Sequence, residues 1–211
     1  MTTEDLIAAL VADPGRGRRS AVGFLRAAAF AALVTGVIFV AAIGVRSDFF
    51  AALASVRFVF KLTVTGTAVV TLAIVARASL YPTFSLKDSV PMMLVAPLML
   101  LFGANAELAS TPAALWANAL IGKDSMICLA VIPSLGLPPL AVIVAAMQKG
   151  APARPGLSGL FAGLLAGAMA STFYAANGAD DSPLFVAVWY PLAVAALSGA
   201  GAVAGRLFLR W

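Results

Sequence analysis

The side chains that most often carry chemistry are scarce in this sequence. No histidine occurs among its 211 residues, and there is one cysteine, Cys128. Without histidine there is no HExxH zinc motif and no Ser–His or Cys–His pair, and a single cysteine cannot form an internal disulfide. We therefore predict no catalytic residues, no metal ligands and no cofactor, and a protein that is not an enzyme.

Two adjacent carboxylates, Asp180 and Asp181, are the remaining candidates for acid–base chemistry. Neighbours in sequence normally diverge, so a paired-aspartate hydrolase site requires that both side chains converge on one pocket. The alternative is structural: a turn, followed by Asp181 or Ser182 as the N-cap of a helix whose first turn holds Pro183. We favour this second interpretation.

The composition is that of a membrane protein. Hydrophobic residues make up 62% of the chain and charged residues 11%, and the mean hydropathy is +1.01. A soluble domain has about 45–50% apolar and about 25% charged residues, and it still exposes much of its surface to water. The lipid bilayer must therefore surround most of this chain.

Six apolar runs are long enough to cross a bilayer, which takes about 20 helical residues. They cover approximately 21–44, 58–75, 89–106, 125–147, 156–176 and 184–207. We predict an all-α fold: a polytopic transmembrane bundle of six helices over residues 21–211, preceded by a short cytoplasmic segment at 1–20.

The basic residues predict the orientation of this bundle. The segments on the side of the N-terminus hold ten Lys or Arg residues, and those on the other side hold four. An excess of Lys and Arg marks the cytoplasmic side, so both termini are predicted to be cytoplasmic. The net charge of +5 does not indicate direct nucleic-acid binding, because the basic residues are spread between the apolar runs.

Ionisable residues inside the apolar runs are the usual markers of function in membrane proteins. Lys61 lies near the outer end of the second run, and no run has a carboxylate near its middle. The missing carboxylate argues against a proton-coupled transporter. For Lys61 we favour the interpretation that its ammonium reaches the lipid headgroups over a functional role.

Glycines recur at every fourth position in the last two runs. They are Gly159, Gly163 and Gly167 in the fifth run, and Gly201 and Gly205 in the sixth. Such stripes let helix backbones approach closely. Packing inside the bundle is the favoured interpretation, and homodimerisation is the alternative.

The first residues, MTTEDLIAALVADPGRGRRS, predict a short amphipathic helix ended by Pro14 and Gly15. Its acidic start and its apolar face comprise Glu4, Asp5, Leu6, Ile7, Leu10 and Val11. Such a helix either docks in a groove on a cytoplasmic partner or lies on the membrane surface.

Three segments together resemble the NrsF-type membrane anti-sigma factors, which are six-span bacterial proteins. They are TEDLIAALVAD near the start, CLAVIPSLGLPPLAVIVAAMQKGAPARPGLSGLFAGLLAG from Cys128 onward, and FYAANGADDSPLFVAVWYPLA around the paired aspartates. The resemblance extends over essentially the whole chain, and the string DDSPLFVAVWY is its most specific part.

The resemblance implies a stress-response regulator of transcription in the bacterial inner membrane that holds an extracytoplasmic-function (ECF) sigma factor inactive. The implied partner-binding residues are those of the N-terminal helix: Glu4, Asp5, Leu6, Ile7, Leu10 and Val11. The implied signal-sensing residues on the outer side are Cys128, Asp180 and Asp181. A small six-span transporter or channel subunit is the alternative function, and it predicts a polar cavity at mid-membrane depth.

The chain departs from the family pattern at one position. Family members commonly carry a second outer cysteine, often beside a histidine, where this chain has Asn177 and Gly178. The intramolecular disulfide and the thiolate pair of the family are thus impossible here. Either the signal differs, or Cys128 pairs between protomers, or the residue at position 178 has been altered. Cys128 is alternatively a small buried apolar residue without a sensing role.

Overall fold

The computed structural model describes residues 15–150 and 152–209, with side chains from residue 22 onward. These residues form helices and connecting turns and contain no strand, which confirms the all-α prediction. The elements are α2 (Gly15–Ala42), α3 (Phe49–Ala52), α4 (Val56–Ala78), α5 (Leu86–Ser110), the 3-10 turn η1 (Ala113–Leu115), α6 (Trp116–Ile121), α7 (Ser125–Met147), α8 (Pro155–Ala175) and α9 (Pro183–Phe208).

Six helices in this part of the chain are long and apolar enough to cross a membrane. They are α2, α4, α5, α7, α8 and α9, and their apolar parts agree with the six predicted runs. The α5 helix continues to Ser110, four residues past the predicted end of the third run. Backbone hydrogen bonds continue a helix through polar residues such as Glu107 and Ser110, whereas hydropathy alone ends the run at residue 106.

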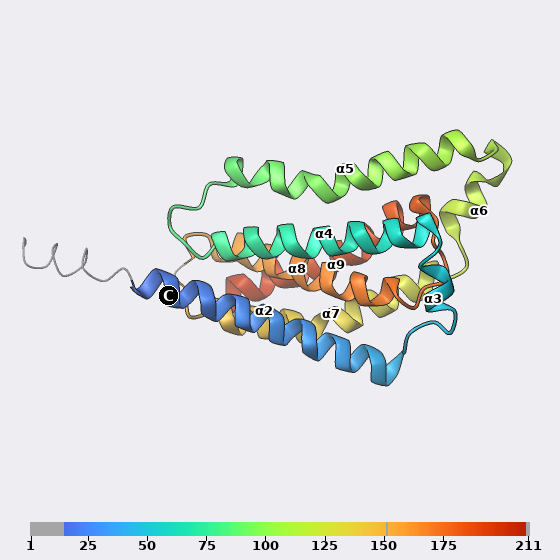
Figure 1. Cartoon of the computed structure of the whole chain (residues 1–211). Coiled ribbons are helices and arrows are strands. Elements are labelled where there is room, and N and C mark those ends of the chain that lie inside the picture. Colours follow the sequence, from blue (N-terminus) through green and yellow to red (C-terminus); the bar gives the residue numbers. More distant parts are fainter. Residues whose placement is uncertain (1–14, 151, 210–211) are drawn as a thin grey trace, which may run out of the picture.

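The long helices run alternately in opposite directions between the two ends of the bundle, which lie at the left and right of Figure 1. The terminal end holds the start of α2, the α4–α5 and α7–α8 connections and the end of α9. The distal end holds residues 43–55, 111–124 and 176–182. Two short segments at the distal end, α3 and the η1–α6 pair, were not predicted, because they are too short to give a periodic pattern.

The α8 helix is the centre of the bundle. Two thirds of its apolar span is buried, against 17% for α5 at the periphery. Gly159 and Gly163 face the backbone of α9 at Gly201 and Leu197, with no room for a side chain between the two helices. The prediction that these glycines pack inside the bundle is confirmed, so a homodimer would have to use another surface.

Apolar side chains between the helices form two clusters. The cluster toward the terminal end includes Phe24, Met147 and Phe161. The cluster toward the distal end includes Cys128 and Tyr174. The second cluster directly underlies the polar groups of the distal end and supports them from within.

Candidate functional site

The residues of the predicted partner-binding helix lie outside the residues that the structure describes. They are Glu4, Asp5, Leu6, Ile7, Leu10 and Val11. The predicted sensing residues lie at or near the distal end. There the α8–α9 loop (residues 176–182) contacts the neighbouring segments through hydrogen bonds and ion pairs. The site described below is therefore a network of charged and polar groups centred on this loop.

Lys61 is the most buried charged group of this network, with 1% of its surface exposed. Its ammonium donates hydrogen bonds to the Asp181 carboxylate at 2.5 Å and to the carbonyl oxygen of Gly178 at 2.9 Å. It also lies 5.3 Å from the centre of the Phe58 ring. The prediction that Lys61 reaches the lipid headgroups is wrong, because the Asp181 carboxylate in the α8–α9 loop pairs with the ammonium instead.

Asp181 has a second basic partner in Arg46, on the α2–α3 connection. The Arg46 guanidinium donates to Asp181 at 3.1 Å and to both carboxylate oxygens of Asp48 at 2.6 and 2.7 Å. The hydrogen bonds to Asp48 and Asp181 raise the pKa of Arg46, and Arg46 lowers the pKa of Asp48. Asp181 thereby joins α4 and the α2–α3 connection to the α8–α9 loop.

Asp180 points to a different part of the molecule. Its carboxylate accepts hydrogen bonds from the backbone N–H groups of Lys123 at 2.9 Å and Asp124 at 3.0 Å, just before α7. The two aspartates thus have separate partners, as neighbours in sequence usually do. Ser182 is the N-cap of α9, since its hydroxyl accepts from the Phe185 N–H, and Asp181 is not.

Glu107 is a buried acid that sequence reasoning missed. It lies near the end of α5 with 5% of its surface exposed. Its carboxylate accepts from the Ser182 hydroxyl at 2.7 Å and from the Leu184 N–H at 3.0 Å, and lies 3.4 Å from the Arg57 guanidinium. A lone acid at the end of an apolar run was the available clue, and its two hydrogen-bond donors come from a segment at least 75 residues away.

Glu107→Ala should loosen α5 from the rest of the bundle. The change leaves the Ser182 hydroxyl and the Leu184 N–H without their acceptor, which costs about 1–3 kcal/mol. We expect faster amide hydrogen exchange across the distal half of α5, measured by mass spectrometry in detergent micelles. Asn105→Ala removes an exposed amide that bonds only within the same helix, so it is the control and should leave exchange unchanged. Equal exchange in both variants would contradict the role of Glu107.

Cys128 is fully buried and is a free thiol. It lies one helical turn into α7, in the cluster that also contains Ile132, Tyr174 and Tyr190. This burial is the one expected of a small apolar residue. It argues against a disulfide between protomers, because the thiol does not reach the surface of the chain.

The arrangement forms a set of contacts that hold the distal end together. Besides the ionic pairs, the Asn177 amide donates to the Gly44 carbonyl at 3.1 Å, and the Trp189 indole donates to the Leu120 carbonyl at 2.8 Å. No group of three or more possible metal ligands occurs among the residues described. The contacts of the α8–α9 loop add to the apolar cluster beneath it in joining α8 and α9 to the other segments at this end.

Comparison with known proteins gives a family match over nearly the whole chain. The model described as "NrsF: Negative regulator of sigma F" matches residues 9–211. The "Anti-sigma-F factor NrsF" of Caulobacter vibrioides is 44% identical over 77 residues, which are 36% of each chain. The "Probable anti-sigma-F factor NrsF" of Azospira oryzae is 34% identical over 94 residues, which are 44% of each chain. The aligned part thus spans less than half of either relative, and no solved structure matches the chain.

Proposed function

Because the chain belongs to the NrsF family of negative regulators of sigma F, we propose that it sequesters a sigma factor at the bacterial inner membrane through its N-terminal segment. The partner proposed is of the ECF type. The observation that carries this proposal is the family match over residues 9–211, which includes the end of the predicted N-terminal helix and all six long helices.

The mechanism begins with the apolar face of the N-terminal helix. In the helix predicted from the sequence, Leu6 and Leu10 would share one side with Ile7 and Val11, and a groove on the sigma factor would take up these side chains. Glu4 and Asp5 would meet basic groups at the edge of that groove. A sigma factor held in this way at the membrane is kept from RNA polymerase.

The proposed orientation places both termini in the cytoplasm. Several basic residues lie at the terminal end of the bundle: Arg77, Lys87, Lys149, Arg154 and Arg206. At the distal end, three of the basic residues pair with carboxylates: Arg46, Arg57 and Lys61. This distribution supports a cytoplasmic terminal end by the positive-inside rule.

Release of the sigma factor would follow an event at the outer, distal end. Asp180 and Asp181 tie the α8–α9 loop to its neighbours, and Cys128 lies in the cluster beneath it. The α8 helix then connects this loop to the terminal end through the centre of the bundle. An outer ligand can drive release only by binding one of the two states more tightly than the other.

Capture of cytoplasmic proteins by the intact chain tests the docking face. We expect the intact chain to recover a sigma factor and the variant with Leu6→Asp and Leu10→Asp to recover at least about tenfold less, since each change places a charge on a buried contact. Mass spectrometry of the captured proteins gives both identity and amount. Ala8→Asp with Ala12→Asp adds the same charge to the opposite helical face and is the matched control, which should capture as well as the intact chain.

Two results would contradict the proposal. Equal loss in both charged variants would show that the apolar face has no special role. Failure of the intact chain to capture any sigma factor, together with movement of a solute into liposomes, would favour the transporter or channel alternative.

A further inference from the structure

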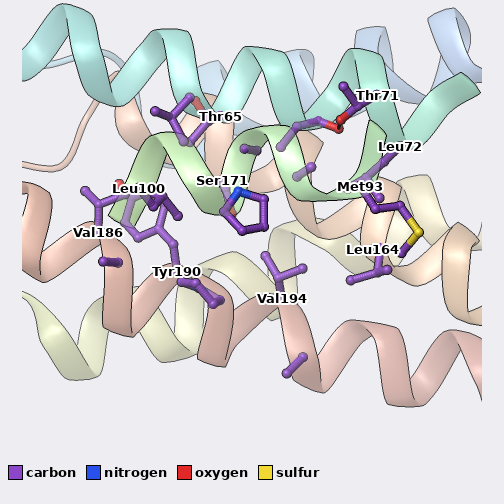
Figure 2. A pocket seen from close by; sticks show the side chains of 18 of the residues that line it. Thr65, Thr71, Leu72, Met93, Leu100, Leu164, Ser171, Val186, Tyr190 and Val194 are labelled. Carbon is purple, nitrogen blue, oxygen red and sulfur yellow. Dashed lines mark hydrogen bonds between the residues drawn. The ribbon is translucent and has the colours of Figure 1, made fainter. Parts of the chain in front are cut away.

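A side pocket of about 540 Å³ lies between α4, α5 and α9, with α8 as its floor (Figure 2). Ligand pockets in proteins typically have volumes of about 300–1,000 Å³. Its lining is mainly apolar, and includes Leu72, Met93 and Leu164. Leu101 and Pro191 belong both to this lining and to the exposed surface, so the pocket reaches the lipid-facing side of the bundle.

The pocket exists because α5 packs against the bundle at its edges. The Phe60 ring of α4 fills the space beside Gly103 of α5, and Glu107 holds the end of α5 to the start of α9. Between these contacts and the terminal end, small side chains such as Ala68, Ala96 and Ala168 leave the space unfilled.

Ser171 is a polar residue of the pocket wall whose hydroxyl lacks a hydrogen-bond partner within the described part of the chain. Its side chain is 3% exposed, and its hydroxyl is the one buried side-chain polar atom without a hydrogen bond among the described residues. The hydroxyls of Thr65 and Thr71, which also line the pocket, bond to backbone carbonyls of their own helix. A buried hydroxyl without a partner is unfavourable, so a ligand atom that accepts its hydrogen bond would stabilise the site.

We propose that the pocket binds one acyl chain of a phospholipid from the distal leaflet, with the ester carbonyl oxygen accepting a hydrogen bond from the Ser171 hydroxyl. This site is independent of the sigma-factor docking proposed above. It follows from the pocket, from the unpaired hydroxyl and from the bilayer that surrounds the helices.

The depths of Ser171 and Leu164 along α8 match those expected for the ester group and the acyl chain of such a lipid. Ser171 is four residues from the distal end of α8, or about 6 Å at the helical rise per residue. Leu164, at the opposite part of the pocket, lies about 10 Å farther toward the terminal end. The hydrocarbon core of a bilayer is about 30 Å thick, so the ester lies near its boundary while the chain extends toward the middle.

Photolabelling of the full chain tests this site. The protein is reconstituted in vesicles of phosphatidylethanolamine and phosphatidylglycerol at roughly 3:1, with a small share of phosphatidylethanolamine that carries a diazirine on one acyl chain. After irradiation, peptide mass spectrometry compares labelling at Leu164, inside the pocket, with labelling at Leu33, on the exposed face of α2. We expect Leu164 to be labelled more strongly than Leu33.

Three variants separate a specific site from ordinary lipid contact. Ser171→Ala should lower labelling at Leu164 by about three- to tenfold, the effect of one lost hydrogen bond. Ala195→Phe fills the pocket from its rim and should abolish that labelling, whereas Ala196→Phe, the neighbouring exposed alanine outside the lining, should leave it unchanged.

Thermal unfolding of each variant confirms that it is folded before labelling is compared. The proposal is overturned if Leu164 is labelled no more than Leu33. It is likewise overturned if folded Ser171→Ala or Ala195→Phe keeps the labelling of the unchanged protein, because the contact is then unspecific or lacks the hydroxyl anchor.

Discussion

Asp181→Asn should destabilise the protein by about 3 kcal/mol, because it leaves the buried ammonium of Lys61 without a counter-charge. Lys61 is 1% exposed, and Asp181 is the carboxylate with which it pairs at 2.5 Å. The asparagine keeps the size of the side chain, so the loss is mainly electrostatic. For a chain of this length the change corresponds to a fall in Tm of roughly 6–12 °C, measured by thermal unfolding in detergent micelles.

Two further variants test the cause of this loss. Asp48→Asn removes the other carboxylate partner of Arg46 at an exposed position and should change Tm little. Lys61→Met combined with Asp181→Asn removes both charges, so the double variant should be more stable than Asp181→Asn alone. If Asp181→Asn lowers Tm no more than Asp48→Asn does, the buried pair does not stabilise the distal end.

Gly163→Ala should destabilise the bundle by about 3 kcal/mol, at the upper end of the usual range for overpacked cores. A Cβ atom at this position would overlap the carbonyl oxygen of Leu197 and would lie 2.6 Å from the Cα atom of Ser198. Both are backbone atoms of α9, so no side-chain rotation relieves the contact and the two helices must separate. Thermal unfolding in the same detergent measures the loss.

Gly199→Ala is the matched control, because an added Cβ atom at Gly199 meets nothing within 4 Å. The same substitution in the open position should be neutral or slightly stabilising, since alanine has the higher helix propensity. Similar losses of Tm in both variants would mean that the close approach of α8 and α9 is not needed. A loss confined to Gly163→Ala would establish this approach as a main determinant of stability.

Much of the architecture follows from the sequence alone. Each long helix needs only its own run of about 20 apolar residues, and the bilayer has no water to satisfy an open backbone, so hydropathy predicts the helices one at a time. Each glycine stripe can likewise be recognised within a single apolar run. The prediction that these stripes are packing faces is confirmed by the contact of Gly163 with α9. The docking role of Leu6 and Leu10 is still a prediction, because they lie outside the described residues.

The polar contacts at the distal end were decided by the tertiary structure. Lys61 and Asp181 are 120 residues apart, and Glu107 and Ser182 are 75 apart, so no local pattern pairs them. The sequence placed Lys61 near a membrane surface, where a long side chain normally reaches water. Only the packing of α4 against the α8–α9 loop brings a carboxylate within reach of the ammonium. The same is true of the side pocket, which depends on how α5 meets α4 and α9 and leaves no trace in the hydropathy of any single helix.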